Sequence, residues 1–101
     1  MAKSTLKVLR EGNALTYQIS GSFDYSLVKL FKKTYQAEGK ADLYILDLMK
    51  TEKIDSSAIG GLMYFHHFAG GKNADITLAN ASPEIKRLLN IAQLHHAFKI
   101  E

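Results

Sequence analysis

The sequence predicts an α/β protein in which helices pack against one mixed sheet of four to five strands, in the order β-β-α-β-α-β-α. Residues 14–20 alternate apolar and polar side chains, as a half-buried strand does. Residues 43–48 form a nearly continuous apolar run of the kind found in strands that are covered on both faces. Residues 24–39 and 82–92 carry apolar side chains at spacings of three and four, which is typical of amphipathic helices that lie on a sheet.

The chain opens with a predicted hairpin. We expect strands over residues 6–10 and 14–20, joined by Glu11, Gly12 and Asn13, because Gly and Asn tolerate the positive φ that hairpin turns need.

The first helix follows a corner at residues 21–23. Asp24 is a good N-cap, because its carboxylate accepts hydrogen bonds from the free amides of a first turn, and Gly39 suits the left-handed conformation that ends a helix. The apolar face of this helix contains Leu27, Val28, Phe31 and Tyr35, while Lys29, Lys32 and Lys33 project elsewhere.

Residues 43–48 are predicted to be the central strand, and Asp47 stands near the carboxyl end where open α/β sheets place their functional crevice. Three consecutive N-cap candidates, Asp55-Ser56-Ser57, then precede a second helix that ends at Gly70-Gly71. The pair Gly60-Gly61 lowers helix propensity by about 1 kcal/mol per residue relative to Ala, and we expect it to permit close packing of helix on sheet.

The remaining elements are a strand over residues 76–79 and a helix that begins at Ser82-Pro83-Glu84. Serine is a capping residue, proline has no amide to lose at the first helical position, and the glutamate faces the positive end of the helix dipole. This helix continues to Ala92. Residues 95–101 add either a short edge strand or a frayed tail.

Composition favours one domain over residues 1–101 of a cytoplasmic protein. The chain has no cysteine, and neither a signal peptide nor a run of about 20 apolar residues is present, so we expect no membrane insertion. The net charge of +3 comes from scattered residues rather than a basic stripe, and we therefore expect no nucleic-acid partner.

Local patterns give no support for catalysis, a metal or a cofactor. Ser56 lacks the flanking glycines of a Gly-x-Ser-x-Gly elbow, and the glycine pairs lack the remainder of a phosphate-binding motif. The histidines occur as adjacent pairs, His66-His67 and His95-His96, which is poor metal geometry on a helix. Whether Asp24, Asp47 and Asp55 converge is left open by the sequence.

Several linked motifs nevertheless resemble one family. Leu46-Asp47-Leu48, then residues 54–60 with Asp55-Ser56-Ser57, then residues 76–89 are similar to the STAS domain, and more narrowly to the stand-alone STAS proteins that antagonise anti-sigma factors. The resemblance runs from the corner at Gly21 to about Leu94 without a large gap, and it implies a STAS-like fold.

The resemblance implies that Ser56 is the phosphate acceptor for a GHKL-type serine kinase that doubles as the anti-sigma factor, with a PP2C-type phosphatase to restore the serine. The Gly-x-x-Asp corner implies that Asp24 lies near the kinase-facing surface. The chain departs from the family pattern at Ala58, where a glycine is usual. The implied partner-binding residues are Asp24, Asp55, Ser56, Ser57, Ala58 and Ile59.

Three alternatives stand beside this hypothesis. From local sequence alone, Asp55-Ser56-Ser57 is a helix cap with no further role. The second alternative is a STAS subunit of an ABC-type lipid-trafficking transporter, which would dock on an ATPase without phosphorylation. The third alternative is a small-ligand or nucleotide sensor that uses the crevice near Asp47 and Ser56.

Overall fold

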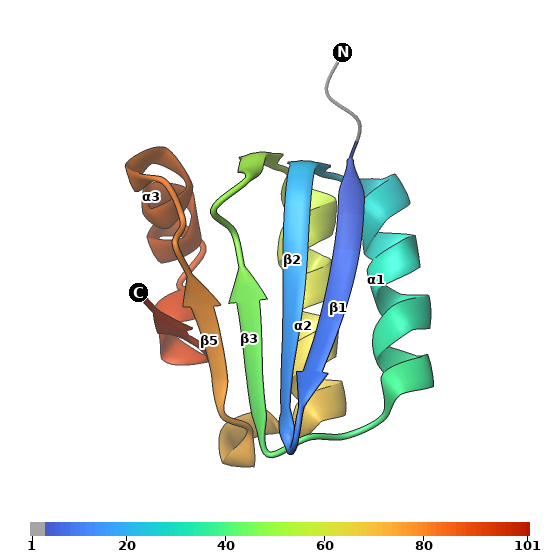
Figure 1. Ribbon diagram of the computed structural model, residues 1–101. Coiled ribbons are helices and arrows are strands. Elements are labelled where there is room, and N and C mark those ends of the chain that lie inside the picture. Colours follow the sequence, from blue (N-terminus) through green and yellow to red (C-terminus); the bar gives the residue numbers. More distant parts are fainter. Residues whose placement is uncertain (1–3) are drawn as a thin grey trace.

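A computed structural model describes residues 4–101 and shows a sheet with helices on one face and along one edge (Figure 1). The elements are β1 (Thr5–Glu11), β2 (Ala14–Phe23), α1 (Tyr25–Glu38), β3 (Leu43–Asp47), β4 (Thr51–Ile54), α2 (Ser56–Ala69), β5 (Ile76–Ala79), α3 (Pro83–Ile91) and β6 (Lys99–Ile100), with short 3-10 helices at Gly71–Asn73 and Leu94–His96. The predicted α/β class and the order of the predicted elements are confirmed.

The sheet has six strands rather than the four to five expected. Its order is β1-β2-β3-β5-β6, so β3 is central as predicted, and β4 pairs with β2 beside that path. Only the β1–β2 pair is antiparallel among the described strands. The two-residue β6 is the edge strand foreseen within residues 95–101, whereas β4 was not expected, because its sequence Thr-Glu-Lys-Ile has no apolar alternation.

Strand β2 also runs further than predicted, to Phe23 rather than Ser20. Its pairing changes from β3 to β4, with an irregularity in register between Gly21 and Ser22. The buried Thr51 hydroxyl donates a 2.6 Å hydrogen bond to the carbonyl of Ile19 and fastens β4 to β2. The corner expected at residues 21–23 is therefore a paired strand end.

The prediction that residues 43–48 are covered on both faces is wrong. Tyr44, Leu46 and Leu48 are buried, but Leu43 and Ile45 are only half-buried, and β2 shows the same alternation. Both long helices, α1 and α2, lie on one face of the sheet, and α3 lies at the side of the sheet that contains β5 (Figure 1). Residues 43–48 are therefore a nearly continuous apolar run in a strand that helices cover on one face only.

The core between the sheet and the long helices is aromatic. Tyr17 on β2 contacts Phe31 on α1 edge-on, with ring centroids 5.3 Å apart, and Phe65 on α2 with centroids 5.9 Å apart. The Tyr17 hydroxyl is fully buried without a hydrogen-bond partner, and burial raises its pKa far above the usual range. Such edge-to-face pairs add about 0.5–1.5 kcal/mol each beyond the area they bury.

The two long helices meet closely at Gly61. A Cβ at this position would lie 2.8 Å from Val28 Cγ1 of α1, whereas a Cβ at Gly60 would meet nothing within 4 Å. The glycine pair thus permits close packing, but of helix on helix rather than of helix on sheet, and only through its second member.

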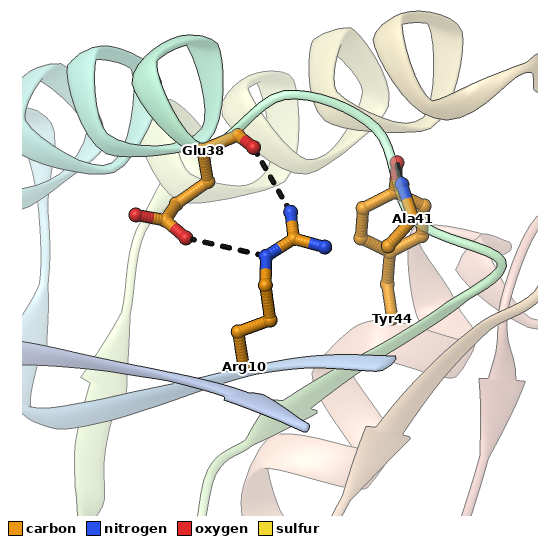
Figure 2. A network of polar contacts seen from close by, with 4 residues as sticks. All are labelled: Arg10, Glu38, Ala41 and Tyr44. Atoms are coloured by element: carbon orange, nitrogen blue, oxygen red, sulfur yellow. Dashed lines mark hydrogen bonds and ion pairs between the residues drawn. The ribbon is translucent and has the colours of Figure 1, made fainter. Parts of the chain in front are cut away.

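The connection from α1 to β3 is held by polar contacts (Figure 2). Arg10 Nη2 donates to the Glu38 carbonyl at 2.9 Å, and Arg10 Nε lies 3.7 Å from the Glu38 carboxylate. Beyond the helix end, the Ala41 amide donates to the Tyr44 hydroxyl at 2.8 Å. These bonds fix the C-terminus of α1 against the hairpin and direct the chain into β3.

Within residues 4–101 no helix combines the length and the apolar character that a membrane span requires.

Candidate functional site

The pairing of β2 with β4 brings two distant aspartates together. Phe23 and Ile54 are partners in this parallel ladder, and Asp24 and Asp55 are the residues that follow them. Both aspartates line one shallow hollow of about 190 Å³, together with Lys53. The sequence left open whether these aspartates converge, and in the structure Asp24 and Asp55 lie together.

Asp24 and Asp55 cap their helices in the same way. Asp24 Oδ1 accepts from the Leu27 amide at 3.2 Å, and Asp55 Oδ1 accepts from the Ala58 amide at 3.0 Å. Both residues have extended backbone, with φ of −119° and −123°. The predicted capping of α1 and α2 is confirmed. Because β2 and β4 pair directly before the caps, the positive ends of two helix dipoles are neighbours at the carboxyl end of these strands.

Asp47 does not join this pair. Its Oδ1 accepts from the Met49 amide and from the Asn80 side chain, both at 3.1 Å, and so ties the end of β3 to the turn after β5. Its role in the structure is to hold these two strand ends.

The serines after Asp55 differ in their surroundings. Ser56 is the first residue of α2 and is exposed, whereas Ser57 is half-buried. Ala58 is fully buried in the core, so its methyl group has no surface to offer, and Ile59 is half-buried. A bulky or charged modification is accommodated most easily at Ser56.

An apolar groove runs from Ser56 to α3. It measures about 390 Å³ and is lined by Ile54, Asp55, Ser56, Ile59, Leu88, Ile91 and Ala92. The α3 side of this groove was not predicted from the sequence. A signal was present, because Leu88 and Ile91 are apolar positions beyond the two, Ile85 and Leu89, that α3 buries. Ile91 is 69% exposed.

The histidine pairs lie away from these residues. His66 packs edge-on against Phe98 with centroids 5.5 Å apart, and the rings of His95 and His96 lie 4.2 Å apart. In the part of the chain that the structure describes, no three or more His, Asp and Glu side chains are grouped so as to hold a metal ion.

Comparison with known proteins shows the family. The model of the STAS domain matches residues 5–101. The chain belongs to the STAS domain family. A STAS-domain containing protein of Pseudomonas aeruginosa is 40% identical over 91 residues, which are 89% of this chain and 90% of that protein.

Solved structures share the fold of this STAS domain at low sequence identity. The anti-sigma factor antagonist SpoIIAA in its unphosphorylated form superposes with a TM-score of 0.82 at 14% identity, over 96% of this chain and 88% of SpoIIAA. The phosphorylated form of SpoIIAA, from Bacillus, gives a TM-score of 0.70 at 14% identity, over 98% and 91% of the chains. An anti-sigma factor antagonist from Mycobacterium paratuberculosis gives 0.76 at 16% identity, over 97% and 85%. The predicted STAS-like fold is confirmed.

Proposed function

We propose that this STAS domain is a partner-switching regulator of the anti-sigma-factor antagonist type, whose state is set by phosphorylation of Ser56. The observation that carries the proposal is the position of Ser56, which is exposed at the first turn of α2, beside the capping carboxylate of Asp55 and on the wall of an apolar groove. SpoIIAA, which shares the fold, exists in a phosphorylated and an unphosphorylated form.

The unmodified protein binds a GHKL-type serine kinase that also acts as an anti-sigma factor, or another effector, in the cytoplasm. Its docking surface comprises Asp24, Asp55, Ser56, Ser57 and Ile59, and Ala58 supports this surface from beneath, because Ala58 is fully buried and its amide donates to Asp55. A PP2C-type phosphatase reverses the modification. The STAS domain itself is a binding protein without catalytic activity.

Phosphorylation changes binding without unfolding the domain. A phosphoserine carries about −1.5 to −2 charges at pH 7, and the N-terminus of α2 favours that charge by up to about 2 kcal/mol. The same charge on the wall of an apolar groove must lose its water when a partner docks, which is costly. A loss of about 4 kcal/mol of interface energy weakens binding roughly a thousandfold.

The test is to incubate the protein with the kinase and ATP and to map the phosphate by mass spectrometry. We expect modification of wild type and of Ser57→Ala, and none of Ser56→Ala. Phosphate found on Ser57 alone would overturn the assignment of Ser56.

A small-ligand role has one supporting observation, the groove of about 390 Å³. Its lining of Ile54, Ile59, Leu88, Ile91 and Ala92 suits an apolar molecule rather than a nucleotide. Titration with a small apolar molecule, with a nucleotide as the control, tests this candidate when it is followed by the amide resonances of Ser56 and Ile91.

A further inference from the structure

Helix α2 presents an uncharged face to solvent. From Ser56 to Ala69 it contains no Asp, Glu, Lys or Arg. Ser56, Gly60, Met63 and His67 succeed one another at helical spacing and are all exposed, so they form a stripe on its outer face. An outer helix normally carries charges on its solvent side, and one that is apolar all round is normally buried. This stripe therefore has the composition of a covered surface.

The stripe is hollowed at its middle. Gly60, Met63, Tyr64 and His67 line a depression of about 480 Å³. The depression is open and shallow, and a Cβ at Gly60 would have free space around it. Tyr64, 74% exposed, and Met63, 43% exposed, form walls. The depression has room for an apolar side chain of another molecule.

Helix α1 gives this depression a positive edge. The close contact of Gly61 with Val28 sets α1 alongside α2, and Lys32 and Tyr64 line the same small cavity between them. Lys29 is exposed one turn earlier, with its ammonium 5.5 Å from the centroid of the Tyr25 ring. The carboxylate of α1, Glu38, lies at the far end of the helix beside Arg10. Lys32 thus places a positive charge next to Tyr64, and Lys29 adds a second on the exposed side of α1.

We infer that the surface formed by Lys29, Lys32, Gly60, Met63, Tyr64 and His67, here called the α1–α2 surface, binds an acidic amphipathic helix of a protein partner. An apolar side chain of that helix enters the hollow over Gly60, and its carboxylates face Lys29 and Lys32. The hollow favours a protein over a lipid bilayer, because a bilayer takes up protruding apolar groups and cannot fill a concave site.

This surface deepens the proposed function and rests on it for the identity of the partner and the sign of regulation. Ser56 stands at one end of the stripe, four residues or about 6 Å along the axis from Gly60. That is within the Debye length of about 8 Å at physiological salt. A phosphate on Ser56 would repel the carboxylates of an acidic helix, so phosphorylation and an acidic partner oppose each other.

The experiment uses two synthetic helical peptides about 18 residues long, long enough to be partly helical in water. Both carry the same Leu and Phe face, and they differ only in having Glu or Lys along one flank. Binding is followed by amide chemical shifts of the full chain. We expect the Glu peptide to bind about tenfold tighter, as a few exposed ion pairs allow, with shifts at Gly60, Met63, Tyr64 and His67.

Variants locate the effect. Lys29→Glu with Lys32→Glu should reverse the preference, so that the Lys peptide binds tighter. The matched control, Lys7→Glu with Lys72→Glu, makes the same change in net charge at exposed positions away from the α1–α2 surface and should keep the preference for Glu. Gly60→Met should fill the hollow and weaken binding of the Glu peptide about tenfold or more.

Equal binding of the two peptides, no binding at millimolar concentration, or shifts confined to the α3 groove would overturn the inference. Binding to phosphatidylglycerol vesicles that Lys29→Glu with Lys32→Glu abolishes, without a preference between peptides, would assign the surface to a membrane instead. None of these outcomes bears on kinase modification of Ser56, so the inference and the proposed function fail separately.

Discussion

Gly60 and Gly61 are adjacent in one helix, yet alanine at the two positions should have opposite effects on stability. Gly60→Ala removes the conformational freedom of glycine from the unfolded chain and adds a methyl group that meets nothing within 4 Å. We expect it to stabilise the domain by about 0.5–1 kcal/mol. Gly61→Ala has the same gain in propensity, but its methyl group would lie 2.8 Å from Val28 Cγ1.

The clash at Gly61 should outweigh the gain. Valine is stiff at χ1, so Val28 cannot simply swing away, and overpacking of this kind costs about 1–3 kcal/mol. The net effect of Gly61→Ala is therefore a loss of about 0–2.5 kcal/mol. Urea unfolding at constant m-value measures both changes, and a change of 1 kcal/mol moves Tm by about 4–8 °C in a domain of this size.

A second substitution tests the cause. Val28→Ala removes the methyl groups that a side chain at position 61 would meet, so Gly61→Ala should be less harmful in the Val28→Ala background than alone. If Gly61→Ala stabilised the domain as much as Gly60→Ala does, the account of close helix packing at this point would be refuted.

Three further predictions concern the switch and the core. Ser56→Asp should fold normally and fail to bind the kinase, while Ser56→Ala should bind constitutively. Ser56→Ala should lose little stability, because the side chain that caps α2 is Asp55. Tight binding of the kinase by Ser56→Asp would exclude charge as the switch. Asp24→Asn should keep the melting temperature, since Asn caps as well as Asp, but should slow phosphorylation of Ser56; unchanged rates would leave Asp24 as a cap only. Tyr17→Phe should stabilise the domain by about 1 kcal/mol, because it removes a buried hydroxyl without a partner. Burial raises the pKa of both Tyr17 and Tyr35. Their contribution to stability is therefore complete below the ordinary tyrosine pKa of about 10 and is lost as pH rises above it. Tyr17→Phe should accordingly unfold at a higher alkaline pH than wild type.

The fold was predictable because its larger elements carry strong local signals. The three helix starts at Asp24, Asp55 and Ser82 each have a capping side chain, and all three accept the expected hydrogen bond. Strand β4 carries no such signal, since Glu52 and Lys53 are exposed and its pairing depends on a strand about thirty residues earlier in the chain. Whether such a segment forms a strand depends on its tertiary contacts rather than on its local propensity.

The candidate site was only partly predictable for the same reason. Ser56 and Asp55 stand out through motif and capping, but their neighbourhood with Asp24 follows from the β2–β4 ladder. Ala58 is buried because it shares the inner face of α2 with Leu62 and Phe65, at helical spacing. The apolar groove requires α3 to face the first turn of α2, and no spacing within either helix reveals that arrangement.

The short ladder between β2 and β4 is expected to open more easily than the rest of the domain. Gly21 to Phe23 and Thr51 to Ile54 hold the two helix starts together through a few backbone bonds and the Thr51 hydroxyl, whereas β2 and β3 pair over the buried centre. Local opening of such a peripheral ladder needs less free energy than global unfolding. Hydrogen exchange at Lys53 and Ile54 should therefore report a sub-global opening that parts Asp24 from Asp55 while the aromatic core stays closed.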